Sequence, residues 1–175
     1  MDRIANIALD LIIFLIPIYV ANSTPVILGG GTPLDLGTKL WDGKPLFGES
    51  KTIRGFISGV LGGTVMGGII ASFYLLPFFS TAQDQFIAAI MMSFGTMSGD
   101  AIGSFIKRRF SMEPGKPFIL DTILFVIVAL VFVFPFAKPE LYRIYNIAFF
   151  LGLSLILHPL TNFIANRLGL KKVPW

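Results

Sequence analysis

Long apolar segments constrain the fold of this chain more than any other feature. About 20 apolar residues are needed to cross the hydrocarbon core of a bilayer. Five stretches of roughly that length are expected to span the membrane, at about residues 4–22, 53–79, 86–106, 117–136 and 142–166. The predicted fold is therefore an all-α integral membrane protein with five transmembrane helices, in a single polytopic domain that covers residues 1–175.

The composition excludes several classes of protein. Apolar residues make up 54% of the chain and charged residues only 14%, whereas soluble domains carry about a quarter charged residues. Cysteine is absent, which excludes disulfides, zinc–thiolate sites and thiol nucleophiles. No basic tract resembles a nucleic-acid footprint, so we expect no nucleic-acid partner. Because Asp2 lies beside Arg3 and no small-residue cleavage site follows, the first segment is interpreted as a permanent helix.

The distribution of Lys and Arg predicts the orientation. Eleven of these residues lie in residues 39–54, 107–116 and 167–172, against three elsewhere, namely Arg3, Lys138 and Arg143. Loops rich in Lys and Arg remain in the cytoplasm. The N-terminus is thus expected outside and the C-terminus in the cytoplasm, with two ordered cytoplasmic loops at about residues 23–52 and 107–116. The predicted location is the cell membrane, as a multi-pass protein whose site faces the cytoplasm.

Small residues recur every four positions in two of the predicted spans. The second span has Gly55, Gly59, Gly63, Gly67 and Ala71, and the third has Gly95, Gly99 and Gly103. Such stripes line one helix face and allow close backbone approach, so helix packing is the favoured interpretation. If the two faces meet, Lys51 and Asp100 belong to one cavity.

Charged residues gather at the cytoplasmic end of the third span. Asp100, Ser104 and Lys107 share one helical face, with Arg108 beside it. Asp100 is expected roughly 12 Å below the end of its helix, and Asp121 begins the next span from the same side. Charges at membrane depth indicate a functional site. A structural salt bridge from Asp100 to Lys107 or Arg108 is the alternative, but it leaves Asp121 unexplained. Two carboxylates among cations favour metal-assisted chemistry on phosphate esters.

The first cytoplasmic loop carries too many apolar residues for a disordered linker. Its charged residues include Asp35, Asp42, Lys44 and Lys51, interleaved with leucine, phenylalanine and tryptophan. Gly48 and the Lys51–Thr52 pair precede a helix N-terminus, where backbone N–H groups favour anions. We therefore interpret this loop as a cover over the site.

The last span carries His158, Asn162 and Asn166 at intervals of four residues near its cytoplasmic end. This pattern fits a packing face and a site-lining face about equally well, and both interpretations stay open.

Two motifs together resemble a known family. Asp100, Ser104, Lys107, Arg108, Pro114, Gly115 and Asp121 reproduce the signature spacing of the phosphatidate cytidylyltransferase superfamily. Gly43–Lys44, Phe47–Gly48 and the run from Lys51 to Phe56 resemble its upstream motif. The strings PLDLG, DGKPLFG and KTIRGF are similar to the CDP-archaeol synthase branch. The resemblance covers most of the chain, from Asn22 to about Asp121.

The resemblance implies an enzyme that transfers CMP from CTP to an unsaturated isoprenoid ether-lipid phosphate, with the bilayer as a further partner. Its implied catalytic residues are Asp100, Asp121, Lys107 and Arg108. Its implied substrate-binding residues are Lys51, Thr52, Gly48, Asp35, Asp42, Ser104, Gly115 and Lys44. Asp100 and Asp121 would hold Mg²⁺.

The sequence departs from the bacterial-type signature at two places. Lys116–Pro117–Phe118 replaces His-Gly-Gly, and Leu124 replaces a second acid. One Mg²⁺ is therefore favoured over two, with Asp35 and Asp42 as candidate further carboxylates.

A small ion-coupled transporter is the main alternative function, since it too needs buried carboxylates and glycine-rich helices. Against it, the polar groups gather at one membrane face, and no inverted repeat is visible. A non-enzymatic lipid or nucleotide binder is a second alternative.

Overall fold

Helices account for all the regular structure in the described part of the chain. The computed structural model describes residues 2–112, 116, 118–171 and 173. The elements there are α1 (Asp2–Leu28), α2 (Ile53–Phe73), α3 (Ala82–Arg109), α4 (Ile119–Val133), the 3-10 helix η1 (Pro139–Tyr142) and α5 (Ile144–Arg167). Four helices are long and apolar enough to span a membrane, and the fifth, α4, is apolar but has 15 residues. The predicted all-α membrane protein is confirmed.

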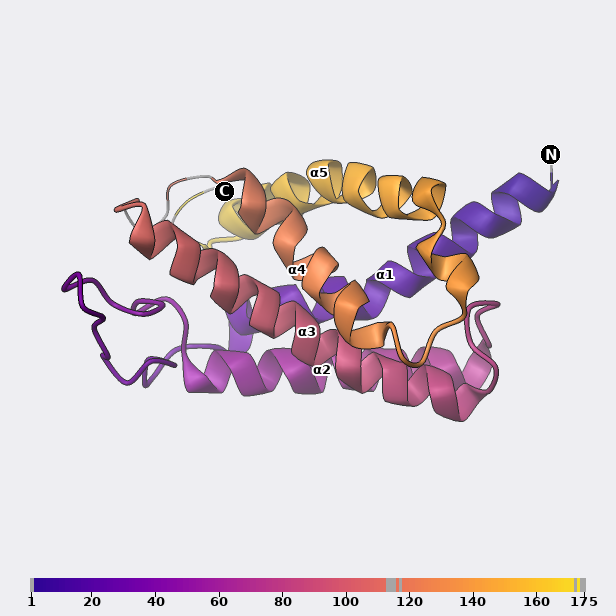
Figure 1. Cartoon of the computed structure of the whole chain (residues 1–175), viewed down its shortest axis with the longest axis horizontal. Helices are drawn as coiled ribbons and strands as arrows, with labels where there is room; N and C mark the ends of the chain where they lie inside the picture. Colours follow the sequence, from indigo (N-terminus) through magenta and orange to yellow (C-terminus); the bar gives the residue numbers. More distant parts are fainter. Residues whose placement is uncertain (1, 113–115, 117, 172, 174–175) are drawn as a thin grey trace.

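The helices run back and forth, so the connections gather at two ends of the molecule (Figure 1). At one end lie the residue 29–52 loop, the last turns of α3 and α5, and the first turn of α4. At the other end lie the N-terminus and the connections at residues 74–81 and 134–143. The predicted candidate site therefore falls at one end of a helical bundle.

The first helix is longer than predicted. It was expected to end near Asn22, but α1 continues through Pro25 to Leu28. The hydroxyl groups of Ser23 and Thr24 donate to carbonyl groups one turn earlier, so these polar residues are satisfied within the helix. A proline removes only its own N–H donor, and the helix ends where the glycines of residues 29–31 begin. The predicted 23–52 loop is thus shortened to residues 29–52.

The second helix is shorter than predicted. It ends at Phe73, not near Phe79, and residues 74–81 form a compact connection. The Gln85 side chain fixes this connection, because it accepts from Leu76 N (2.8 Å) and donates to Tyr74 O (3.0 Å). The other three predicted spans differ from α3, α4 and α5 by four residues or fewer at each end.

The two small-residue stripes are both buried, but against different helices. Gly59 and Gly63 of α2 pack against α1 as well as α3, each with a carbonyl oxygen of α1 at 2.8 Å from where a Cβ would stand. Gly95 and Gly99 of α3 pack against the backbone of α4. The stripes therefore do not face each other, although the predicted cavity shared by Lys51 and Asp100 assumed that they would. They place α3 between α2 and α4, within reach of side chains from both.

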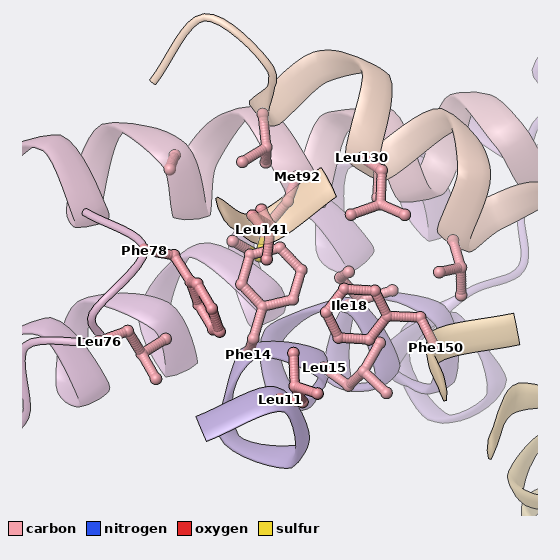
Figure 2. Packing of buried hydrophobic residues seen from close by; sticks show 14 of the residues in the cluster. Leu11, Phe14, Leu15, Ile18, Leu76, Phe78, Met92, Leu130, Leu141 and Phe150 are labelled. Carbon is pink, nitrogen blue, oxygen red and sulfur yellow. The ribbon is translucent and has the colours of Figure 1, made fainter. Parts of the chain in front are cut away.

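The apolar core lies away from the charged end. Figure 2 shows Phe14 and its α1 neighbours packed against Met92 of α3, Leu130 of α4 and Phe150 of α5. Leu76 and Phe78, together with Leu141 of η1, extend this cluster into the connections at the opposite end of the bundle. Aromatic and aliphatic packing thus fixes the helices at one end, and polar contacts dominate at the other.

The close contact between α3 and α4 is testable at Gly99. A methyl group there would stand 2.7 Å from Phe125 Cα and 2.8 Å from Leu124 O, so Gly99→Ala forces two backbones apart. Overpacking of this kind costs about 1–3 kcal/mol. We expect a lower thermal unfolding temperature in detergent. Gly152→Ala of α5 is the control, since its added methyl group meets nothing within 4 Å. Equal unfolding temperatures for the two variants would contradict this packing.

Candidate active site

An ion pair joins the start of α2 to Asp100, the first residue of the charged face of α3. Lys51 Nζ lies 2.5 Å from Asp100 Oδ2, and each side chain is about a quarter exposed, at 23% and 26%. Lys51 immediately precedes Thr52, the N-cap of α2. The predicted sharing of one cavity by Lys51 and Asp100 is confirmed, because both line a pocket between the end of α1, the start of α2 and α3.

A second ion pair joins α3 to α4. Lys107 Nζ lies 2.6 Å from Asp121 Oδ2. Asp121 is in the first turn of α4, where the helix dipole favours a negative charge. Its Oδ1 lies 3.3 Å from the position that a Cβ at Gly103 would take, so the missing side chain of Gly103 makes room for this carboxylate. The alternative pairing, Asp100 with Lys107 or Arg108, does not occur.

Together, the pairs place two carboxylates and two ammonium groups along one face of α3. Asp100 and Lys107 are two helical turns apart on that face, and buried Ser104 lies between them. Each carboxylate uses Oδ2 for its lysine. Among the described residues no group of three His, Cys, Asp or Glu side chains could hold a metal ion. The arrangement therefore offers a cation two carboxylates, with further ligands to come from a substrate or water.

Arg108 lies against the first loop. Its Cδ is 3.7 Å from where a Cβ of Gly48 would stand. Its Nε is buried and makes no hydrogen bond within the described part of the chain. A half-buried arginine with donor capacity to spare suits an anionic ligand.

Asp35 organises the loop itself. Its carboxylate accepts from the backbone N–H groups of Gly37 (3.0 Å), Phe47 (2.8 Å) and Gly48 (2.9 Å). Burial alone would raise the pKa of Asp35, but these N–H donors outweigh it and lower the pKa below the usual value. Asp35 was predicted to contact substrate or metal. The structure gives it a positioning contact to Gly48, and so to the segment beside Arg108, and its predicted ligand contact stays a prediction.

Arg109 fastens the same loop to the end of α3. Its guanidinium donates to Asp42 Oδ1 (2.6 Å) and Pro45 O (2.5 Å). Lys44 donates in return to Arg109 O (3.1 Å) and Ser111 Oγ (2.7 Å). These bonds give Asp42 and Lys44 bracing contacts, and their predicted substrate contacts stay predictions. In the sequence Arg109 was counted only among the basic residues that predict the orientation, and this bracing function was missed.

The remaining predicted site residues divide into two groups. Thr52 Oγ1 caps α2 by accepting from Gly55 N (3.0 Å), and Ser104 is buried on the α3 face. Their predicted donation to substrate stays a prediction. Gly115, and with it Pro114, lies outside the described residues.

The C-terminal segment reaches the candidate site unexpectedly. Lys171 Nζ donates to Asn162 Oδ1 (2.8 Å), and Asn166 Nδ2 donates to Lys171 O (2.9 Å). These bonds assign the two asparagines, whose function the sequence left open, to holding the tail. The spacing of four residues between Asn162 and Asn166 was visible in the sequence, but Lys171 as their common partner was not.

The family model that matches this chain is that of the CarS-like CDP-archaeol synthases, and it covers residues 4–175. The chain belongs to this family. A CDP-archaeol synthase of Pyrococcus horikoshii is 41% identical over 172 residues, with 97% of this chain and 98% of the relative covered. The corresponding protein of Methanocaldococcus jannaschii is 44% identical, with 93% and 94% covered.

A solved structure of an intramembrane enzyme for archaeal membrane lipids biosynthesis is also similar. It aligns with a TM-score of 0.72 at 31% identity, covering 86% of this chain and 91% of that chain. The fold in which the two lysine–aspartate pairs are placed is thus similar to that of an intramembrane enzyme for archaeal membrane lipids biosynthesis.

The bracing by Asp35 is testable by hydrogen exchange. Asp35→Asn keeps one acceptor oxygen but loses the charge that binds three N–H groups, so we expect at least tenfold faster exchange in residues 29–52. Glu49→Gln, an exposed change in the same loop, should leave exchange unaltered.

Acid provides a second test of Asp35. Because folding lowers the pKa of Asp35, the stability that this carboxylate contributes is complete above the ordinary value of 3.8 and is lost as the pH falls through the lower folded-state value. Protection unaffected by both the substitution and acid would contradict this assignment.

Proposed function

We propose that this protein is a membrane cytidylyltransferase that transfers CMP from CTP to an unsaturated archaeal ether-lipid phosphate, giving CDP-archaeol and pyrophosphate. The observation that carries the proposal is the pair of lysine–aspartate bridges, Lys51–Asp100 and Lys107–Asp121, at one end of the bundle. Membership of the CDP-archaeol synthase family supports this chemistry.

The reaction we infer is a direct displacement at phosphorus. An oxygen of the lipid phosphate attacks the α-phosphorus of CTP, and the bond from that phosphorus to the oxygen bridging to the β-phosphate breaks. Pyrophosphate leaves with the bonding electrons. The nucleophile is already anionic at neutral pH, so the protein needs no strong general base. Its task is to position two anions and to neutralise their charge.

The cations around the two bridges fit that task. Lys51 comes from the residue before Thr52, the N-cap of α2, Lys107 stands on the α3 face itself, and Arg108 adds a guanidinium with an unused donor. In the proposed complex, phosphate oxygens take over the lysine contacts that the two aspartates make. Thr52 would supply a hydroxyl donor next to Lys51, and Ser104 one between Asp100 and Lys107.

Mg²⁺ is the cofactor that we propose for the site. The donor set fits, because Mg²⁺ in nucleotide enzymes is typically held by one or two carboxylates together with substrate phosphates. Asp100 and Asp121 would hold it, and when bound it would supply charge neutralisation and a fixed orientation for the triphosphate. The two carboxylates favour one ion over two.

A groove beside the site suits the lipid acceptor. It is lined by Leu28 and residues 30–32, 53–54, 57–58 and 61, with a volume of about 600 Å³. Gly30 lines both this groove and the pocket that contains Lys51 and Asp100. Ile57 and Leu61 make its wall apolar. We therefore propose that isoprenoid chains enter from the bilayer between the end of α1 and the start of α2.

We propose that the site end of the bundle faces the cytoplasm. Among the described residues, ten Lys and Arg belong to the loop, helix ends and tail at that end, against three at the other. The positive-inside rule then places the N-terminus outside and the protein in the cell membrane as a multi-pass enzyme. Cytoplasmic CTP would reach the site directly.

The ion-coupled transporter is not supported by the family membership. The geometry also disfavours it, since both carboxylates lie toward the same end of the bundle and not at a midplane between repeats.

Turnover in detergent micelles tests the proposed function. Purified protein should release pyrophosphate and form CDP-lipid from CTP and the isoprenoid ether-lipid phosphate, with no ion gradient. The matching lipid alcohol should give no product, because it lacks the anionic nucleophile. Chelation of Mg²⁺ should abolish turnover and its re-addition should restore it. Micellar protein that makes no CDP-lipid, together with ion-coupled uptake in sealed vesicles, would overturn the enzyme assignment.

The two carboxylates are tested by amide substitution. Asp100→Asn and Asp121→Asn should each reduce turnover at least a hundredfold, because each removes a negative charge from the proposed metal site while preserving shape. Asp84→Asn is the matched control at the opposite end of α3 and should stay within twofold of wild type. Monodisperse elution and an unchanged fold by circular dichroism are required of every variant. Substantial turnover in Asp100→Asn or Asp121→Asn would remove that residue from the site.

A further inference from the structure

The chain reverses direction after α5 and folds back on it. Gly169 has a φ of 72°, a left-handed conformation that ends the helix. Leu170 N and Lys171 N then both donate to Ala165 O, at 2.9 and 3.3 Å. The side chain of Asn166 donates to Lys171 O (2.9 Å). Three hydrogen bonds therefore fix the backbone at Lys171.

The side chain of Lys171 is fixed as well. Its Nζ donates to Asn162 Oδ1 (2.8 Å), one turn before Asn166 on the same face of α5, and the residue is half-buried. The Asn162 amide is neutral, and its oxygen orients the ammonium group.

Ring packing aligns this part of α5 with the carboxylate of α4. The His158 ring packs on Phe125, with 5.4 Å between centroids. Phe125 is one turn past Asp121 on α4, and His158 is one turn before Asn162 on α5. Because the two helices run in opposite directions, a step of one turn toward the site end brings Asp121 and Asn162 to the same level. Lys171 is held at that level.

The electrostatics agree with this placement. Burial lowers the pKa of Lys171, and the positive charge of Lys51 lowers it further, while Asp100 and Asp121 oppose the shift. These contributions accord with the level at which the ring packing places Lys171.

We propose that Lys171 is a further substrate-binding residue whose ammonium group contacts a phosphate oxygen of CTP or of the lipid phosphate, and that Asn162 and Asn166 are its positioning residues. This inference rests on the proposed function. It adds a fourth cation to Lys51, Lys107 and Arg108, contributed from the side of the site that α5 covers. Two phosphate-bearing substrates in one site supply more negative charge than three cations and one Mg²⁺ balance.

The tail provides its own matched control. Arg167 carries the same charge four residues earlier, but it is exposed and lies over the Phe163 ring, 5.1 Å from its centroid. Lys171→Gln and Arg167→Gln therefore each remove one positive charge from the same segment. Only the former removes it from the proposed site.

The test is steady-state kinetics of the full-length variants in micelles, with CTP and lipid phosphate titrated separately. We expect Lys171→Gln to lower kcat/KM at least tenfold, Lys171→Arg to recover most of it, and Arg167→Gln to stay within twofold of wild type. A rise in KM for CTP assigns the contact to the triphosphate, and a rise in KM for the lipid assigns it to the acceptor phosphate. Asn162→Ala should cause a smaller loss that disappears in the Lys171→Gln background, since it acts only through the lysine.

Two outcomes would overturn the inference. One is unchanged kinetics in Lys171→Gln with an active wild type, which leaves the proposed function intact. The other is a loss of activity that parallels a fall in unfolding temperature and that Lys171→Arg shares in full, which marks a structural residue. An inactive wild type would instead contradict the proposed function itself.

Discussion

The pairing of charges at membrane depth is the constraint on which the rest of this structure depends. An unpaired aspartate or lysine is costly there, so Asp100 and Asp121 each need a cation from another part of the chain. Lys51 comes from before α2 and Lys107 from α3. Those pairings require α3 to approach both neighbours closely, and buried glycines on α2 and α3 allow that approach. Helix packing and site chemistry thus both require small residues where α3 contacts α2 and α4.

Features with a local period could be predicted from the sequence. Apolar length indicated the helices, and the spacing from Asp100 to Lys107 indicated a charged face, because both follow from the geometry of a single helix. The convergence of Lys51 with Asp100 was anticipated for a partly wrong reason. The two glycine stripes were expected to face each other, but one packs on α1 and α3 and the other on α4. A stripe indicates that a close neighbour exists and not which helix it is.

Features that depend on tertiary contact could not be predicted. The end of α1 was misplaced because Ser23 and Thr24 read as loop residues, although their hydroxyl groups bond within the helix. The loop-bracing bonds of Asp35 and Asp42 were not anticipated, since a carboxylate that binds loop N–H groups or an arginine has the same sequence signature as one that binds a metal. Arg109 and Lys171 looked like ordinary cytoplasmic cations, because only the fold reveals which of many basic residues turns inward.

The recessed position of Asp121 has a consequence for how a lipid substrate would be handled in the proposed reaction. Asp121 lies beside Gly103, six residues before the end of α3, so its carboxylate is recessed by roughly 9 Å along that helix. A phosphate bound at this level would stay near the depth of neighbouring headgroups. Every methylene group lifted out of hydrocarbon costs about 0.8 kcal/mol. In the proposed reaction, a carboxylate recessed to this depth would let the isoprenoid lipid react without being extracted from its leaflet.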